Sequence, residues 1–335
     1  MRKALSAAAV AAALVILAGG AAILYYRDAL ARRPSPTVNK TVVIPAGYPT
    51  ARIGALLESE GLVTSGRVFT WFCRLNGLDG KLEAGRYHLR SGDGIPAIAR
   101  TLAAGKIWLK RFTVPEGYDE KKTAAAVAVA GICPAGAFLK AAAAGDPRGR
   151  VKRKNLEGYL FPDTYEVAAD ATPADVVTMM VDRFFQVMGP KEQARAAALG
   201  RSLDDIVVVA SIVEREAMRK NEKPVVASVF YNRLKRGMRL ESCATVIYAL
   251  GRQPDRLTVQ DLKVDSPYNT YRHDGLPPGP ICSPGKDALL AALYPADTDY
   301  LFFVSNGDGS HTFSKTFGAH NAARAAKKHK GKNRK

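Results

Sequence analysis

The sequence predicts an α+β protein with an N-terminal transmembrane helix, a small α/β module and a mixed helical domain that has a small β portion. Three observations predict this class. An uncharged apolar run opens the chain, strand–turn–helix units follow it, and the second half alternates capped helices with loops before one β-prone hairpin. With 335 residues, 47% of them hydrophobic, the chain is long enough to bury the cores of two domains.

The first predicted element is the run from Ala4 to Tyr26, which contains no charged residue. It is longer than the about 20 residues that cross a bilayer as a helix. Tyr25 and Tyr26 close it as an interfacial aromatic belt would. A cleaved signal peptide is the competing interpretation, but the length of the run and the lack of a clear A-x-A site favour a retained anchor. The short N-terminal tail favours a cytoplasmic N-terminus, with the rest of the chain outside.

The net charge of +18 is concentrated partly in the tail, which reads KKHKGKNRK after Ala326. This tail is predicted to be disordered because it can bury no apolar surface. Basic arms bind nucleic acid, anionic membranes or acidic polymers. An anchored chain outside the membrane disfavours nucleic acid as the partner.

Three similar units follow the anchor. They read TVVIPAGYPTARIGALL from Thr41, RYHLRSGDGIPAIARTLAAG from Arg86 and KRFTVPEGYDEKKTAAAVAVAG from Lys110. Each combines a β-prone stretch, a turn with glycine and a helix start, and Thr50 is predicted to cap the first helix. Units of this kind suit a LysM-like carbohydrate-binding module, and ordinary α+β units fit the same pattern equally well.

A second domain is predicted to begin near LEGYLFPDTYEV at Leu156, followed by helices with recognisable starts. From Leu240 the chain is predicted to be rich in loops until the last of these helices. YLFFV from Tyr300 and HTFS form the arms of a hairpin. The predicted helices run from Thr172 to about Met188, from Lys191 to Leu199, from Ser202 through ASIVEREAM, from Pro224 to Gly237, and near Asp287 to Leu293.

ASIVEREAM places Glu214 and Glu216 against an apolar helical run. Residues two apart on a helix lie about 200° apart around its axis, so these acids cannot form the facing pair of an ordinary glycosidase. Glu216 lies one turn after Ile212 and Val213, the more apolar surroundings of the two. A carboxyl that keeps its proton in apolar surroundings can act as a general acid. Alternatively, both acids are solvated at a helix end.

Other patterns exclude several chemistries. The cysteines Cys73, Cys133, Cys243 and Cys282 are scattered, and no histidine spacing suits a metal, so no metal site or cofactor is expected. GPICSPGK departs from a phosphate loop, and a G-x-S-x-G elbow is absent. SPYNTYRHDGLPPGPI from Ser266 combines aromatic and amide side chains, which suits sugar binding or a loop stiffened by proline.

Together these segments resemble the YceG-like family, the membrane-anchored endolytic murein transglycosylases. Matching segments fall in order across the second half of the chain. They are LEGYLFPDTY from Leu156, ASIVEREA from Ala210, VASVFYNRLKRGMRL from Val226, TVIYALG from Thr245, SPYNTYRHDGLPPGPICSPG from Ser266 and YLFFVSNGDGSHTFSKTFGAHN from Tyr300.

The resemblance implies five parts. They are the anchor and its flanks at 1–33, a LysM-like module at 34–110, a connecting α/β segment at 111–155, a YceG-like catalytic domain at 156–322 and the basic disordered tail at 323–335.

The resemblance also implies a reaction that depends on one carboxyl, Glu216. This residue would protonate the glycosidic oxygen between N-acetylmuramic acid and N-acetylglucosamine, and then take the proton of the muramoyl C6 hydroxyl as a 1,6-anhydro ring closes. No metal or cofactor takes part. The implied substrate contacts are Glu214, Asn232, Tyr248, Asn269, Tyr271, His311 and Phe313, with Glu214 in a supporting role.

One departure from the family pattern lies next to these contacts. Relatives usually read LQTDPTVIYG where this chain reads LESCATVIYA, so Cys243 and Ala244 replace an Asp-Pro pair. Glu241 is the candidate to compensate for the lost aspartate.

The resulting hypothesis is an endolytic lytic transglycosylase of the cytoplasmic membrane, with an extracytoplasmic catalytic domain that acts on nascent peptidoglycan strands beside the peptidoglycan synthases. A non-catalytic peptidoglycan-binding scaffold of the wall-synthesis machinery is the first alternative, and a glycoside hydrolase of similar specificity is the second.

Overall fold

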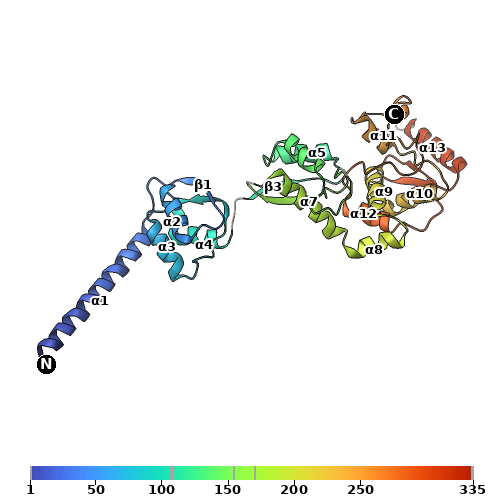
Figure 1. Cartoon of the computed structure of the whole chain (residues 1–335). Helices are drawn as coiled ribbons and strands as arrows, with labels where there is room; N and C mark the ends of the chain where they lie inside the picture. Colours follow the sequence, from blue (N-terminus) through green and yellow to red (C-terminus); the bar gives the residue numbers. More distant parts are fainter. Residues whose placement is uncertain (1, 106–108, 154, 170, 333–335) are drawn as a thin grey trace. The chain divides into compact units, whose positions relative to one another are not determined.

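The computed structural model describes the backbone of the chain except residues 1, 106–108, 154, 170 and 333–335. Side chains are described except at those positions and at 2–13, 15 and 328–332. The chain folds into two compact units (Figure 1). Unit 1 comprises Met1–Lys110 with Val167–Asp170, and unit 2 comprises Arg111–Glu166 with Ala171–Lys335. Elements of both sequence halves are mixed α and β, as predicted.

Helix α1 (Arg2–Ala31) opens unit 1 and contains the predicted anchor. Leu14, Ile16 and Leu17 are each more than 60% exposed. In the part of the chain that the structure describes, no helix is both long and apolar enough to cross a membrane. The transmembrane prediction is therefore not confirmed, and residues 1–13 and 15 lie outside the described side chains.

The rest of unit 1 is a small α/β module around an antiparallel ribbon. Strand β1 (Asn39–Ile44) pairs with β2 (Gly85–Arg90), with Val42 opposite Tyr87. Helices α2 (Thr50–Ser59), α3 (Gly66–Leu75) and α4 (Gly94–Ala103) complete it. Their shared core includes Leu57, Phe69 and Ile98.

Helices α2 and α3 approach closely because glycines face each other between them. A Cβ atom on Gly66 would lie 2.5 Å from the carbonyl oxygen of Gly54. The prediction that Thr50 caps α2 is wrong. Pro49 takes the cap position, and the Thr50 hydroxyl instead accepts a hydrogen bond from Gly80 N at 3.3 Å, because a tertiary donor competes for it.

The boundary between the units falls in the ribbon of β3 (Leu109–Thr113) and β4 (Thr164–Ala168). Unit 2 is otherwise mainly helical, and α9 contacts both α10 and α12 (Figure 1). Its helices before the hairpin are α5 (Glu120–Val129), α6 (Ala135–Ala143), α7 (Pro173–Val187), α8 (Pro190–Ala198), α9 (Leu203–Glu216), α10 (Lys223–Lys235), α11 (Cys243–Leu250) and α12 (Lys286–Leu293). Short 3-10 turns are η1 (Ser91–Asp93) in unit 1 and η2 (Lys220–Glu222) and η3 (Asp261–Lys263) in unit 2.

The predicted hairpin is confirmed as β5 (Phe302–Ser305) paired with β6 (His311–Ser314). The stretch from Leu240 to the start of α12 is rich in loops, as predicted, and contains the short helix α11 and the turn η3. One prediction nearby is wrong. The part of the predicted disordered tail that the structure describes continues α13 (Phe317–Lys332), because AARAAKK has high helix propensity and α13 contacts the hairpin; residues 333–335 lie outside the described part.

Candidate active site

Helix α9 places Glu216 at its C-terminal end. Ser202 Oγ accepts from Asp205 N at 3.0 Å and Asp205 Oδ2 accepts from Ser202 N at 3.1 Å, a reciprocal capping box that fixes where the helix begins. All residues from 206 to 213 are buried. Beyond Glu216 the backbone turns extended at Ala217, so Glu216 stands where the core ends and solvent begins.

The two glutamates of ASIVEREAM diverge, as helical geometry predicts. Glu214 turns toward Lys223, whose Nζ lies 3.0 Å from both carboxylate oxygens, and it also accepts from Gly285 N at 3.1 Å. The two side chains are only 10% and 5% exposed. Burial, followed by the negative charge of Glu214, raises the pKa of neighbouring Glu116. Glu214 therefore belongs to a buried ion pair that holds α9 to α10.

Glu216 is held by one of its oxygens. Its Oε1 accepts from the Ser242 hydroxyl at 2.5 Å and lies 3.4 Å from Ala244 N at the start of α11. Ser242 is buried, and its N–H donates to Thr270 Oγ1 at 3.0 Å. Within the described part of the chain, Glu216 Oε2 has no hydrogen-bond partner. One oxygen is thus oriented by the protein while the other is available to a ligand.

A cavity of about 550 Å³ opens beside Glu216. Its lining includes several aromatic side chains, among them Phe230, Phe302, Phe303 and Tyr271. Flat apolar faces next to a hydrogen-bonding acid match what a pyranose ring offers, which is an apolar face and a polar edge.

An ion pair that the sequence analysis missed supports this cavity. Arg233 is 6% exposed and donates to Leu301 O at 2.9 Å, to Leu240 O at 2.7 Å and to Glu241 Oε2 at 3.0 Å. Glu241 adopts φ = 50°, a left-handed conformation that costs energy for a residue with a Cβ. The available signal was Arg233 itself, because it stands one turn after Val229 and Phe230 on an otherwise apolar helical face.

With this geometry in view, the comparison with known proteins identifies the family. The sequence model of the YceG-like family matches residues 42–326. This chain belongs to the YceG-like family. The match covers the cavity and its supporting helices, including Glu216.

Several relatives of this YceG-like chain carry one name, endolytic murein transglycosylase. The protein of that name from Bacillus subtilis is 34% identical over 307 residues, which cover 86% of this chain and 84% of the relative. The one from Streptococcus pneumoniae serotype 2 is 29% identical over 299 residues, and the match spans 79% of this chain but 54% of that relative. A crystal structure of a YceG-like protein from Listeria monocytogenes aligns with a TM-score of 0.58 at 33% identity and covers 86% of this chain and 99% of that one.

The YceG-like chain also shows what surrounds the substituted positions of LESCATVIYA. Cys243 lines the cavity, and its Sγ lies 3.2 Å from the Tyr271 hydroxyl. Glu241 also lines the cavity and is paired with Arg233 at 3.0 Å, and the prediction that it compensates for the missing aspartate stays a prediction. Cys73, Cys133, Cys243 and Cys282 are all free thiols.

His311 also lines the cavity, on β6. Its Nδ1 lies 2.7 Å from Glu222 Oε2, and its backbone N donates to Glu222 Oε1 at 3.2 Å. Arg219 reinforces the link by pairing with Asp308 at 3.3 Å. The segment just after α9 therefore fixes the hairpin that forms one wall of the cavity.

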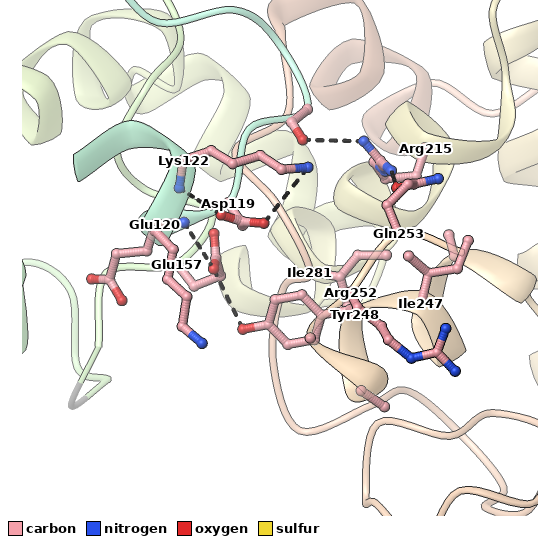
Figure 2. Close-up of a pocket in the computed structure, with 15 residues that line it drawn as sticks. Asp119, Glu120, Lys122, Glu157, Arg215, Ile247, Tyr248, Arg252, Gln253 and Ile281 are labelled. Carbon is pink, nitrogen blue, oxygen red and sulfur yellow. Dashed lines mark hydrogen bonds and ion pairs between the residues drawn. The ribbon is translucent and has the colours of Figure 1, made fainter. Parts of the chain in front are cut away.

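The structure brings together only some of the predicted substrate contacts. Glu216, Tyr271 and His311 line one cavity, whereas Tyr248 lines a neighbouring one, where its hydroxyl approaches Glu157 (Figure 2). The remaining predicted contacts belong to the framework.

Two amides show this framework role. Asn232 donates to Thr298 O at 2.7 Å and to Tyr300 O at 3.0 Å, and so ties α10 to the segment before the hairpin. Asn269 is fully buried, donates to Val264 O at 2.8 Å and accepts from Tyr271 N at 3.0 Å. These hydrogen bonds shape the loop that carries Tyr271, and the prediction that Asn269 contacts the substrate directly stays a prediction.

Phe313, the last predicted contact, packs on Tyr300 with ring centroids 5.6 Å apart. Its ring also lies 6.2 Å from the rings of Phe303 and His311, so Phe313 supports two lining residues of the cavity and is not itself among the described ones.

Proposed function

We propose that this YceG-like chain is an endolytic murein transglycosylase in which Glu216 is both acid and base. The observation that carries the proposal is that the protein holds only one of the two carboxyl oxygens of Glu216. Its Oε1 is oriented by Ser242, and its Oε2 is left to the aromatic cavity. The shared name of the relatives from Bacillus and Streptococcus supports the same activity.

In the proposed reaction, protonated Glu216 donates its proton to the glycosidic oxygen as the bond from that oxygen to the muramoyl C1 breaks. The resulting carboxylate then removes the proton of the C6 hydroxyl, and the C6 oxygen forms a new bond to C1. Glu216 ends the cycle protonated, no water is consumed, and the product carries a 1,6-anhydro ring. A single carboxyl suffices because it alternates between the two roles.

The cavity favours this single-acid mechanism over a two-carboxylate hydrolase. Of its described lining residues, the other carboxylate is Glu241, which is paired with Arg233. A retaining or inverting glycosidase needs a second carboxylate that is free to attack or to activate water.

The location of the enzyme is also a proposal. The uncharged run from Ala4 to Tyr26 supports a single-pass anchor in the cytoplasmic membrane, with unit 2 on the extracytoplasmic side near the peptidoglycan synthases. The ribbon and helices of residues 34–110 support a LysM-like carbohydrate-binding module. The five-part division predicted above stays a proposal in its finer boundaries.

Purified glycan strands test the activity. Wild-type protein, Glu216→Gln and the control Glu166→Gln are incubated with the strands, and the products are weighed by mass spectrometry. Glu166 is half-exposed on β4 and lines neither cavity. We expect products with anhydro ends from wild type and control, and none from Glu216→Gln. Products with reducing ends would identify a hydrolase. Absence of cleavage by the wild type would favour the binding scaffold.

A further inference from the structure

A second cavity adjoins the first through the N-terminal turn of α11. It has a volume of about 370 Å³. Cys243 lines the Glu216 cavity, and the next residue, Ala244, lines the second one. The N–H of Ala244 is the group that approaches Glu216 Oε1 at 3.4 Å. A ligand in the second cavity is therefore separated from the reacting carboxyl by the first turn of one helix.

The floor of the second cavity is a buried carboxyl. Glu157 is 4% exposed, and its Oε2 accepts from Glu120 N at 3.1 Å and from the Tyr248 hydroxyl at 3.4 Å (Figure 2). Burial, reinforced by the nearby charges of Glu120 and Asp119, raises the pKa of Glu157 to about 8. At neutral pH the floor carries a neutral acid, which does not repel an anion.

The lining of this cavity carries charges of both signs, with Asp119 and Glu120 beside the cations Lys121, Lys122, Arg215 and Arg252. Arg252 is paired with Asp261 at 2.7 Å, whereas Arg215 has no acidic partner among the described side chains. Arg215 is exposed and, among the described residues, contacts neutral acceptors alone, namely Gln253 Oε1 at 3.1 Å and Gly117 O at 3.5 Å (Figure 2). Lys122 Nζ lies 3.9 Å from Asp119 Oδ2, a distance too long for a hydrogen bond.

The walls distinguish this cavity from the aromatic one. Tyr248 is the aromatic residue among its described lining, and its ring already packs against Tyr268 with centroids 4.8 Å apart. The Tyr248 hydroxyl therefore points toward the cavity, while the face of its ring is covered by Tyr268. Such walls offer little to a sugar ring, whereas a guanidinium on the rim matches the planar geometry of a carboxylate.

We propose that this second cavity binds the carboxylate-bearing peptide branch of the murein strand, with Arg215 and Lys122 as its cationic partners, while the aromatic cavity holds the sugars beside Glu216. The proposal rests on the proposed function, since it names a further part of the same substrate. It makes Arg215 and Lys122 specificity-determining residues, because they would select strands that carry acidic peptides.

Binding to uncleaved strands tests the proposal separately from catalysis. In the Glu216→Gln background, the Kd is measured for native strands and for strands whose peptide carboxylates have been converted to amides. We expect native strands to bind about tenfold more tightly, and Arg215→Gln and Lys122→Gln each to reduce that ratio several-fold. The control Arg183→Gln removes a half-exposed cation that lines neither cavity, and should leave the ratio unchanged.

Two results would overturn the proposal. One is equal affinity of the Glu216→Gln protein for native and amidated strands. The other is a ratio that Arg183→Gln reduces as much as Arg215→Gln does, which would indicate general attraction to a basic surface. Neither result concerns anhydro products, so the single-acid mechanism would survive both. Conversely, strands that bind with the expected ratio but are never cleaved by the wild type would refute the catalytic function alone.

Discussion

Replacing Glu157 by Gln should change how the stability of unit 2 depends on pH. Glutamine has nearly the same shape and can still accept from Glu120 N and from the Tyr248 hydroxyl, so packing is preserved. It lacks the proton that the buried acid must retain. The substitution therefore removes one contribution to the free energy of unfolding. That contribution arises because Glu157 is neutral in the folded protein and ionised in the unfolded chain.

The magnitude follows from the pKa in the two states. Glu157 has a pKa of about 8 in the folded protein, against 4.5 for a glutamate in the unfolded chain. Between these values the unfolded chain binds fewer protons than the folded one, so stability falls as pH rises through this window and levels off above it. From pH 5 to pH 8, linkage gives a loss of about 3–4 kcal/mol for the wild type that Glu157→Gln should not show.

Urea unfolding at pH 5 and pH 8, followed by far-UV circular dichroism, measures this difference. With Trp108 replaced by Phe in every variant, the fluorescence of Trp71 on α3 supplies an internal reference for unit 1 that Glu157→Gln should not shift. Asp255→Asn, which removes an exposed carboxylate of unit 2, is the matched control. If wild type and Glu157→Gln lose stability in parallel from pH 5 to pH 8, Glu157 is ionised in the folded protein. The inference that the second cavity contains a protonated Glu157 is then wrong.

Three further substitutions test the framework around the site. Ser242→Ala removes the donor that orients Glu216, and should lower kcat about tenfold with KM little changed; a change in KM alone would contradict an orienting role. Gly66→Ala should destabilise unit 1 by about 2 kcal/mol or more, seen in tryptophan-monitored unfolding, because its Cβ would meet Gly54 O; an unshifted midpoint would show that the helices can separate freely. Arg233→Met should cost about 1–3 kcal/mol in the circular dichroism transition, since it leaves the backbone carbonyls of the buried residues Leu240 and Leu301 without their donor; an unchanged midpoint would mean that these hydrogen bonds are dispensable.

Local chemistry made several parts of this protein predictable from sequence. Ser202 and Thr172 cap their helices through side chains that bond the backbone three residues on, an interaction that needs no distant partner. The divergence of Glu214 and Glu216 follows from helical geometry alone. The hairpin at Phe302–Ser305 and His311–Ser314 was visible because a turn-forming segment separates two β-prone runs.

Other features depended on contacts between residues far apart in the chain. Thr50 lost its expected capping role to Gly80, thirty positions away. The order of motifs pointed to Glu216, but the orientation of its carboxyl depends on Ser242, which no periodicity links to α9. The neutral state of Glu157 arises because folding buries it beside Glu120 and Tyr248.

The sequence by itself therefore determined where α9 begins and that its two acids face different ways, because the N-terminal cap and helical rotation act within a few residues. Only the tertiary structure decided which oxygen of Glu216 is free, which amides are framework, and that a second cavity lined by charges of both signs adjoins the first. Hydrogen-bond geometry and burial are set by neighbours that folding brings together. Those neighbours are distant in the sequence, so local sequence patterns do not reveal them.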